Sequence, residues 1–371
     1  MNTTNKHIAF EPVPSKLVKG SPIFMVGNAP TIENIREGVP FSGDGGKEHV
    51  FHKMLGMAGI DFEKCSAGNV FLNKAQRDRV DLFFAKKLEA KKIKAEQGWE
   101  PKFGPLGNWG VCRPEKEADV ERLWAEIDEV QPRLLVAFGT EALWALTGES
   151  NIAMYRGTVM ESREIGGRVY KVLPANHPDA VVRGWNMRAT FVSDLLKAKR
   201  ESKSADFLRK VREIWIRPGL EDIKRFFEIH VEPIRGTPTP LCYDIETADG
   251  MITCIGFSPN DTVSLCIPFW DREHANYWAT QKDEVKAWGY VKEVLEDPDF
   301  VKLAHNTSYD ATWLLKRLGI VVGGRWEDTM HMHHALQPEM KKSLGYLASI
   351  YTDEIAWKSL VKFSQTKKAD A

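Results

Sequence analysis

Short apolar segments alternate with helix-period segments along this chain, and this alternation restricts its possible folds more than any other feature. Apolar strands are predicted at 22–27, 134–139 and 169–174, and amphipathic helices at 117–130 and 140–147. Strands separated by helices pair in parallel, and the helices then cover both faces of the sheet. The first half of the chain therefore predicts a three-layer α/β/α domain with a mostly parallel sheet.

A second α/β unit is predicted downstream, because 371 residues exceed the length of one typical domain. Its strands are expected at 241–247, 251–258 and 262–268, and its helices near 281–296, 308–318 and 329–336. We therefore predict an N-terminal arm at 1–19, a first domain at 20–198, a basic linker at 199–212 and a second domain at 213–371.

The composition limits the compartment and the cofactors. The N-terminus has no basic-then-apolar signal, and no run of about 18 apolar residues occurs, so we predict an intracellular, cytoplasmic protein that does not bind membranes. The five cysteines show no C-x-x-C spacing, which favours buried free thiols over disulfides or a metal cluster. The net charge of +0 does not exclude local basic patches.

Two acids lie one residue apart near the end of a predicted strand, in "LCYDIETADG" (241–250). Alternate residues of a strand point to the same face, so Asp244 and Glu246 project together while Tyr243 and Ile245 face the other way. Like charges held this close repel each other, and a divalent cation between them removes the repulsion. A strand that runs out into solvent is the alternative explanation.

A second polar segment, "KLAHNTSYDATWLLKRLG" (302–319), strengthens the cation interpretation. His305 and Asn306 follow a short apolar strand, and Asn306 is predicted to be the N-cap of a helix that ends at Gly319. Asp310 lies in the first turns of this helix, where its carboxylate can point back at the strand that holds the first two acids.

These segments resemble the DnaQ-like (DEDD) 3′–5′ exonucleases, specifically the proofreading domains of family A DNA polymerases. "DIET" resembles the first motif of that family, "HNTSYD" the second, and 326–351 the D-T-M helix and S-L-x-x-L-A segment that follow. The resemblance implies an RNase H-like domain with a mixed sheet, in which Asp244, Glu246 and Asp310 are catalytic and hold two Mg²⁺ or Mn²⁺ ions. It also implies contacts of the side chains near the second motif with a single-stranded DNA 3′ end, namely those of His305, Asn306 and Tyr309.

The third motif of that family, Y-x-x-x-D or H-x-x-x-D on a late helix, is not found. "YTDEI" (351–355) has Ile355 where the family has its fourth acid, and Asp328, the D-T-M acid, is expected to start a helix instead. We expect the chain to be the front part of a longer polymerase; a partner chain that completes the site is the alternative.

The first half resembles the uracil-DNA glycosylase superfamily, in particular its family 4 branch. The resemblance rests on "FMVGNAPTIENIREGVPFSGDGG" (24–46), "VFLNKA" (70–75), "RGTVM" (156–160) and "ANHPDAVVR" (175–183). It implies a pocket in which Phe41 stacks on the base, Asn73 reads the base edge and His177 hydrogen-bonds the base or a phosphate. The same pocket would include Gly27 and Asn28.

Two departures make uracil excision by this half uncertain. Asn28 stands where the family has its catalytic glutamate, and an amide has no negative charge with which to stabilise a cationic sugar. The four cysteines that hold the iron–sulfur cluster of family 4 are missing, so no such cluster is expected. Between these motifs, the insertion 78–110 brings the basic stretch "KKLEAKKIK" (86–94) together with Trp99 and Trp109, which could contact DNA or only pack.

The leading function is therefore a metal-dependent 3′–5′ exonuclease behind a glycosylase-like domain, at the front of a phage-type polymerase. Its partners would be DNA and a polymerase domain or other replication proteins. A DNA-binding module without chemistry and a working glycosylase with an inactive exonuclease are the alternatives.

Overall fold

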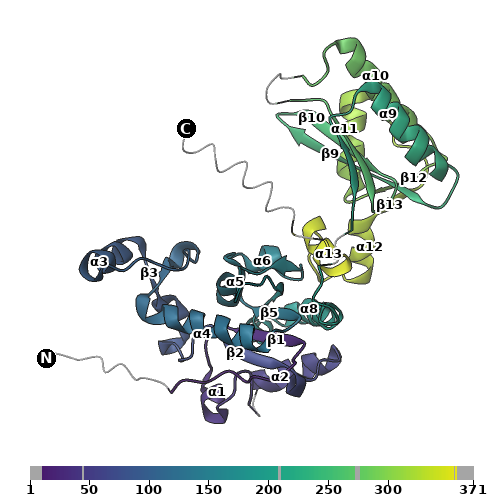
Figure 1. The fold of residues 1–371 in the computed structure, drawn as a ribbon. Helices are drawn as coiled ribbons and strands as arrows, with labels where there is room; N and C mark the ends of the chain where they lie inside the picture. Colours follow the sequence, from purple (N-terminus) through teal and green to yellow (C-terminus); the bar gives the residue numbers. More distant parts are fainter. Residues whose placement is uncertain (1–10, 44–45, 208–209, 272–275, 355, 357–371) are drawn as a thin grey trace. The chain divides into compact units, whose positions relative to one another are not determined.

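The computed structural model describes residues 11–43, 46–207, 210–271, 276–354 and 356, and it contains two compact units (Figure 1). The first unit consists of residues up to Phe207 and of the described residues from Gly345 on; the second is Leu208–Leu344. Both units are mixed α/β, which confirms the predicted fold class. In the part of the chain that the structure describes, no helix has the length and apolarity to cross a membrane.

The sheet of the first unit has five strands in the order β2-β1-β5-β7-β6. The first four are parallel, and β6 runs antiparallel to β7. These strands are β1 (Ile23–Gly27), β2 (Ser66–Asn69), β5 (Leu134–Phe138), β6 (Met160–Glu161) and β7 (Lys171–Ala175). Parallel sheets need cover on both faces, and successive residues of β5 indeed alternate between two apolar clusters.

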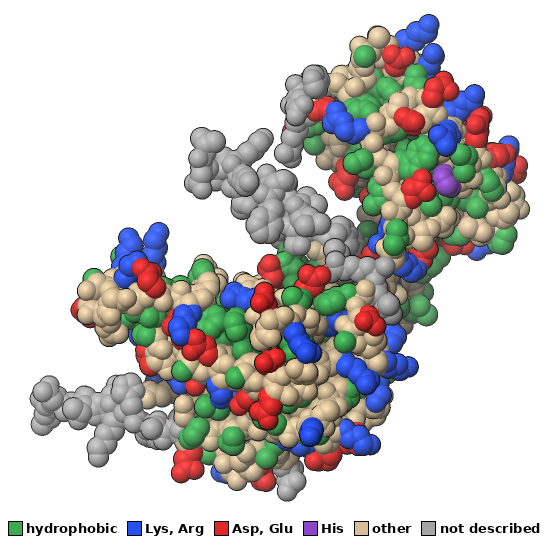
Figure 2. Space-filling model, in the orientation of Figure 1, with side chains coloured by type: hydrophobic (Ala, Val, Ile, Leu, Met, Phe, Trp, Pro, Cys, Tyr) green, Lys and Arg blue, Asp and Glu red, His purple; other side chains and the backbone are tan. Residues whose placement is uncertain are grey.

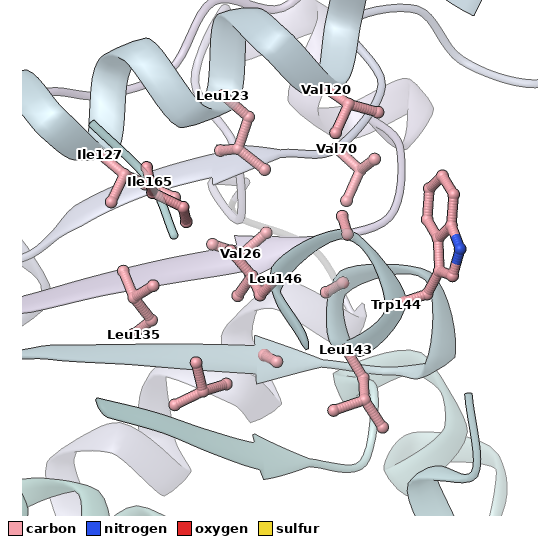
Figure 3. Close-up of a cluster of buried hydrophobic side chains, with 14 of the residues drawn as sticks. Val26, Val70, Val120, Leu123, Ile127, Leu135, Leu143, Trp144, Leu146 and Ile165 are labelled. Carbon is pink, nitrogen blue, oxygen red and sulfur yellow. The ribbon is translucent and has the colours of Figure 1, made fainter. Parts of the chain in front are cut away.

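Helices cover each face of this sheet. On one face, α4 (Pro114–Val130) and α5 (Thr140–Thr147) pack onto the strands, and the α4 side chains Val120, Leu123 and Ile127 follow the helical spacing of three to four residues (Figure 3). On the other face, α2 (Gly46–Met57) and α8 (Arg188–Glu201) form the second cluster. The three-layer architecture predicted for the first half is therefore confirmed.

The smaller elements of the first unit lie around these layers. They are α1 (Ile32–Glu37), β3 (Phe84–Ala85), α3 (Lys87–Gln97), β4 (Val111–Cys112), α6 (Ile152–Tyr155) and α7 (Pro178–Arg183). Short β3 and β4 pair antiparallel within the predicted insertion 78–110. The start of the predicted basic linker is helical, since residues 199–201 complete α8, and residues 208–209 lie outside the described part.

Helix α13 (Leu344–Tyr351) packs against the first unit although it follows the second in sequence. Arg156 and Asp194 form a buried ion pair, and Arg156 Nη1 also donates to Ser349 Oγ at 2.9 Å. Lys197 Nζ donates to the carbonyls of Ser349 at 3.0 Å and Thr352 at 2.6 Å, which satisfies acceptors at the helix C-terminus. The compact second unit is thus shorter than the predicted domain 213–371, whose limits stay a prediction.

The second unit contains a six-stranded mixed sheet in the order β13-β12-β9-β10-β11-β8. Its strands are β8 (Glu213–Ile216), β9 (Pro240–Ala248), β10 (Met251–Ser258), β11 (Val263–Pro268), β12 (Val301–Ala304) and β13 (Trp326–Asp328). A two-residue turn joins β9 to β10, with φ of 51° at Asp249 and 78° at Gly250. Asp-Gly is the sequence that such turns favour, because both positions need positive φ.

The α-helices that accompany this sheet in the described residues are α9 (Leu220–Phe226), α10 (Gln281–Glu296), α11 (Thr307–Leu318) and α12 (Thr329–Leu336). The buried residues Tyr243 and Ile245 of β9 join one apolar cluster with Val291 of α10 and Leu314 of α11. This cluster occupies one side of β9, so the acids of that strand are left on the opposite side.

Candidate functional site

The two acids of β9 project from the same side of the strand. Asp244 and Glu246 are exposed, whereas Tyr243 and Ile245 between and beside them are buried. This is the alternation predicted from the sequence, and it results from the apolar cluster that holds the other face of β9.

Asp310 reaches the edge of β9 from α11, and it is only 2% exposed. Strand β12 pairs with β9 only along Pro240–Cys242, so among described strands none covers that edge farther along. The Ile245 N–H there donates to Asp310 Oδ1 at 3.1 Å. Asp310 therefore lies beside the strand that holds the other two acids, in the direction that its helix position predicts.

The electrostatic environment of Asp310 disfavours its charge. Burial raises the pKa of the Asp310 carboxyl to about 6, and the nearby charges of Glu246 and Asp328 also raise it, while backbone N–H donors act against this increase. A cation among the acids would remove that penalty, and carboxylate oxygens are the ligands that Mg²⁺ and Mn²⁺ prefer.

The three acids offer the ligand type that divalent cations prefer, but their side chains are not spaced to hold one cation together. Within the described ranges, no group of three or more His, Cys, Asp or Glu side chains is arranged to hold a metal ion. Two of the acids project from one face of β9, and the third is fixed at its edge by the Ile245 N–H. The exposed pair would have to turn toward Asp310 to form a shared site.

Asp328 links the starts of two helices near these acids. Its Oδ1 accepts from Met330 N–H at 2.8 Å and from His331 N–H at 3.3 Å, at the start of α12. Its two oxygens also accept from Asn306 N–H at 3.1 Å and Thr307 N–H at 2.8 Å, at the start of α11. Asp328 is thus the helix-start acid that the sequence predicts, and it caps a second helix as well.

The N-cap residue of α11 is Asn306, as the sequence predicts, although its side chain does not cap the helix. Asn306 occupies the N-cap position, but its backbone is left-handed, with φ of 67°, and its side chain makes no capping hydrogen bond. An N-cap side chain reaches the helix N–H groups from extended backbone. Here the carboxylate of Asp328 takes the N–H of Thr307 instead.

The other residues of the second motif surround this position. Tyr309 is half-exposed, and its hydroxyl lies 2.7 Å from Thr247 Oγ1, one residue beyond Glu246 on β9. His305 Nδ1 lies 2.9 Å from Thr329 Oγ1. A nucleic-acid end at the acids of β9 would thus meet the tyrosine, while the histidine is held toward α12.

A second candidate site lies in the first unit, near the carboxyl ends of its parallel strands, where α/β sheets commonly bind ligands. A cavity there is lined by Phe41, Glu48, Asn69 and His177 among others. Its free volume of about 20 Å³ is close to that of one water molecule. The side chains therefore close this pocket against a nucleobase in the present conformation.

Gly27 packs tightly against two side chains that line the cavity, those of Phe41 and Asn69. A Cβ atom at Gly27 would lie 2.7 Å from Phe41 Cζ and 2.5 Å from Asn69 Oδ1, so only glycine fits. The Phe41 backbone is left-handed, with φ of 58°, and its ring packs 5.4 Å from that of Phe51 and 5.6 Å from that of Phe138. The predicted stacking residue is thus at the pocket but packs into the core.

Two amides beside the pocket have atoms without partners. Asn28 Oδ1 and Asn69 Nδ2 are buried, and neither has a hydrogen-bond partner among described residues. A buried polar atom without a partner is costly, so each favours a ligand or water. Asn69, at the end of β2, was not among the residues predicted from the sequence; β2 consists of small and polar residues, and no apolar pattern marks its end.

The predicted base reader Asn73 is not among the side chains that line this cavity. Its Oδ1 accepts from Lys116 Nζ at 3.3 Å instead. Asn69, four residues earlier, occupies the pocket because β2 ends there.

Burial disfavours the charged forms of two ionisable groups that line the pocket, His177 and Glu48. His177 caps α7, and its Nδ1 accepts from Asp179 N–H at 3.3 Å. Burial lowers the pKa of His177, which favours the neutral ring. Burial likewise raises the pKa of Glu48, whose carboxylate accepts from Thr31 Oγ1 at 3.1 Å. The imidazole therefore suits hydrogen bonding better than charge pairing, and the carboxyl is less acidic than usual.

Comparison with known proteins finds two family matches and one curated relative. A family model described as "Uracil DNA glycosylase superfamily" matches residues 14–200, and one described as "3'-5' exonuclease" matches residues 240–370. A DNA polymerase of Bacillus phage SP01 is 26% identical over 243 residues, which is 59% of this chain and 25% of that polymerase. The chain thus spans about a quarter of the length of this relative.

Solved exonuclease structures are also similar to part of the chain. The EXD2 exonuclease domain soaked in Mn and Mg is 16% identical, with a TM-score of 0.26 over 37% of this chain and 67% of that one. Trypanosoma brucei RNase D in complex with RNA U12 is 16% identical, with a TM-score of 0.31 over 41% of this chain and 51% of that one.

Proposed function

The chain belongs to the uracil DNA glycosylase superfamily and contains a 3′–5′ exonuclease domain, and on this basis we propose that it is a nuclease module of DNA replication. Both resemblances predicted from the sequence are confirmed by the family matches. The proposed reaction is metal-dependent removal of nucleotides from a DNA 3′ end. The polymerase domain of a phage replication protein is the proposed partner, in the cytoplasm of the host, because the curated relative is a phage polymerase.

The arrangement of three acids around β9 is the observation that supports this proposal most. Asp244 and Glu246 share one face of the strand, and the strand backbone holds Asp310 at its edge. When bound, two Mg²⁺ or Mn²⁺ ions would supply an activated water and stabilise the leaving 3′ oxygen. In our proposal these three carboxylates hold the ions.

The surrounding side chains position the DNA end in this proposal. Tyr309 and Thr247 bond to each other beside Glu246, so they would contact the terminal nucleotide together. Asn306 and His305 follow β12, and the Asp328 carboxylate fixes the backbone of Asn306. Their proposed role is to orient the 3′ end toward the acids.

Release of nucleotides from a 3′-labelled single strand tests the proposal. The full chain is expected to release nucleotides with Mn²⁺ and to lose this activity with EDTA. Asp244→Ala should abolish release, whereas Asp249→Asn, which removes an exposed acid from a turn that asparagine tolerates, should retain it. Release that persists in Asp244→Ala, or a chain without Mn²⁺-dependent release, would contradict the proposal.

For the first unit we propose a base-binding scaffold without excision. The unpartnered amides Asn28 and Asn69 support base binding, because a base edge offers both donors and acceptors. The amide at Asn28 and the closed cavity argue against cleavage of the glycosidic bond, because no charge at that position stabilises a cationic sugar.

An assay for abasic sites on uracil-containing single strands tests this second proposal. The full chain is expected to form none above background. Uracil release that Asn69→Ala abolishes would overturn the scaffold interpretation and establish an active glycosylase.

A further inference from the structure

The insertion of the first unit forms a groove that neither candidate site uses. The groove has a volume of about 490 Å³, and it lies between α3 and the loop at 101–111. Four lysines line it, and we call it the lysine groove: Lys86, Lys87, Lys91 and Lys94. In Figure 2, blue side chains project from the part of the surface where Figure 1 draws α3.

The spacing of these lysines concentrates positive charge on one side of α3. Lys87, Lys91 and Lys94 are separated by four and three residues, so they form one row along the helix. Like charges at this spacing repel each other and destabilise a helix. A negatively charged occupant of the groove would remove this repulsion.

The lysines of this row are left largely without intramolecular partners. Lys94 pairs with Glu100, but Lys86, Lys87 and Lys91 make no ion pair with another described residue. Lys92, which does not line the groove, pairs with Glu96. The acids of this region therefore neutralise little of the charge that faces the groove.

Packing of α3 against the core does not account for the row. No side chain of α3 is buried, and Leu88 is 83% exposed. A helix with no buried side chain gains little from burial, so core packing does not require this row of lysines.

The floor of the groove, in contrast, is anchored. Strands β3 and β4 pair there, and a Cβ atom at Gly110 would lie 2.0 Å from the Ala85 carbonyl oxygen. The Trp109 ring packs 5.7 Å from that of Phe84, and Trp99 Nε1 donates to Glu117 Oε2 at 3.1 Å. Both tryptophans of the insertion are thus used for packing and anchoring, and the lysines are the groups left for a ligand.

From this geometry we propose that the lysine groove binds the phosphate backbone of single-stranded DNA. Charge complementarity selects a polyanion, and the apolar side chains of Ala85, Ala90 and Val111 in the groove suit the sugar and base faces between phosphates. The choice of DNA rests on the proposed function. The groove would hold a strand by its backbone, without reading its sequence.

Binding of a fluorescent thymidine oligonucleotide, measured by anisotropy in EDTA at several salt concentrations, tests this proposal. The variant Lys86→Glu, Lys87→Glu, Lys91→Glu is compared with a control that makes the same charge change at exposed lysines elsewhere in the first unit. The control substitutions are Lys19→Glu, Lys53→Glu and Lys199→Glu.

The groove variant should bind at least about tenfold more weakly than the control at low salt, because each phosphate contact releases counterions. Its slope of log K against log salt should fall by about 2, which is roughly 0.7 for each of three lost contacts on a single strand. Equal binding and equal slopes in the two variants would overturn the proposal.

Two further measurements keep this test separate from the proposed nuclease. Binding is measured in EDTA, which removes metal ions, so its result does not depend on exonuclease activity. Weaker binding by the groove variant than by the control would support the proposal whether or not the chain releases nucleotides with Mn²⁺. Competition by poly-glutamate as effective as that by single-stranded DNA at equal charge would show a groove for acidic peptides and would overturn the proposal.

Discussion

The two candidate sites differ in how each unit treats its polar groups. In the first unit, Asn28 and Asn69 are neutral amides beside a small cavity of about 20 Å³. In the second, Asp244 and Glu246 are exposed acids beside a buried third, Asp310. A buried amide atom without a partner favours a ligand or water, whereas carboxylates near one another favour a cation. The comparison teaches that the first unit keeps its family fold without the family's acid at position 28, while the second unit keeps three acids beside one strand.

Asp310→Asn should give the largest effect and sharpen this comparison. Its amide oxygen can still accept from Ile245 N–H, but a carboxylate that we propose to hold metal is lost, so nucleotide release should fall by about 100-fold or more. The metal-free second unit should become more stable, because burial and Glu246 disfavour the charge that is removed. Release rates and denaturant midpoints in EDTA measure both effects. A variant that is active, or that is less stable than the parent, breaks the comparison.

Arg156→Ala tests whether buried charge in the first unit is, by contrast, neutralised within the fold. The substitution leaves Asp194 buried without its ion pair and removes a donor to Ser349, so it should cost about 3–5 kcal/mol of unfolding free energy. Urea unfolding of the first unit measures this loss. Arg200→Ala is the matched control, because its exposed pair with Asp353 should contribute at most about 1 kcal/mol. Similar losses of unfolding free energy in both variants would mean that the buried ion pair contributes no more than the exposed one.

Asp328→Ala tests how much a carboxylate of the second unit contributes to stability when backbone N–H groups bond to it. Loss of two helix caps should cost about 2 kcal/mol in this unit. Burial alone would raise the pKa of Asp328, but four backbone N–H donors outweigh it and hold that pKa below its usual value. The stabilisation is therefore present above the unfolded pKa of about 3.9 and is lost as pH falls through the lower folded pKa.

The pH dependence of unfolding free energy measures this effect. The difference between the parent chain and Asp328→Ala should be constant near neutral pH and should shrink below about pH 4. A difference that does not change with pH would mean that the charge of Asp328 contributes nothing.

The smallest expected effect concerns uracil recognition by the first unit. Because the pocket is closed, single strands with one uracil or one thymine should bind with affinities within about twofold of each other. Competition binding in EDTA measures the ratio. A preference for uracil that Asn69→Ala removes would show that the pocket opens, and the two units would then differ less than proposed.

Much of the fold follows from local sequence pattern. Strand β10 and helices α10 and α12 have the predicted limits, because alternation and helical spacing are properties of short segments. Near the end of α11, Leu318 is 37% exposed, because the core contact of that helix is made near Leu314. The attachment of α13 to the first unit could not be predicted, since Arg156 and Ser349 lie 193 residues apart.

Some features of the candidate sites likewise follow from local sequence, and others depend on contacts between distant segments. The shared face of Asp244 and Glu246 follows from strand geometry alone, although the roles of these residues stay predictions. The capping of α11 by Asp328 depends on the pairing of β13 with β12, which no local pattern reveals. Asn69 lines the cavity and Asn73, four residues later, does not, so the role of Asn73 stays a prediction; a family resemblance fixes the order of motifs better than the residue at which a strand ends.

The return of the chain at Gly345 means that the second compact unit is inserted into the first. Both ends of the insert connect to the same folded body, through α8 on entry and α13 on exit. A single proteolytic cut in the entry segment would therefore leave the two fragments associated, because Lys197 and Arg156 still donate hydrogen bonds to Ser349 of α13. Only a second cut, before α13, would release the nuclease-like unit as a separate piece.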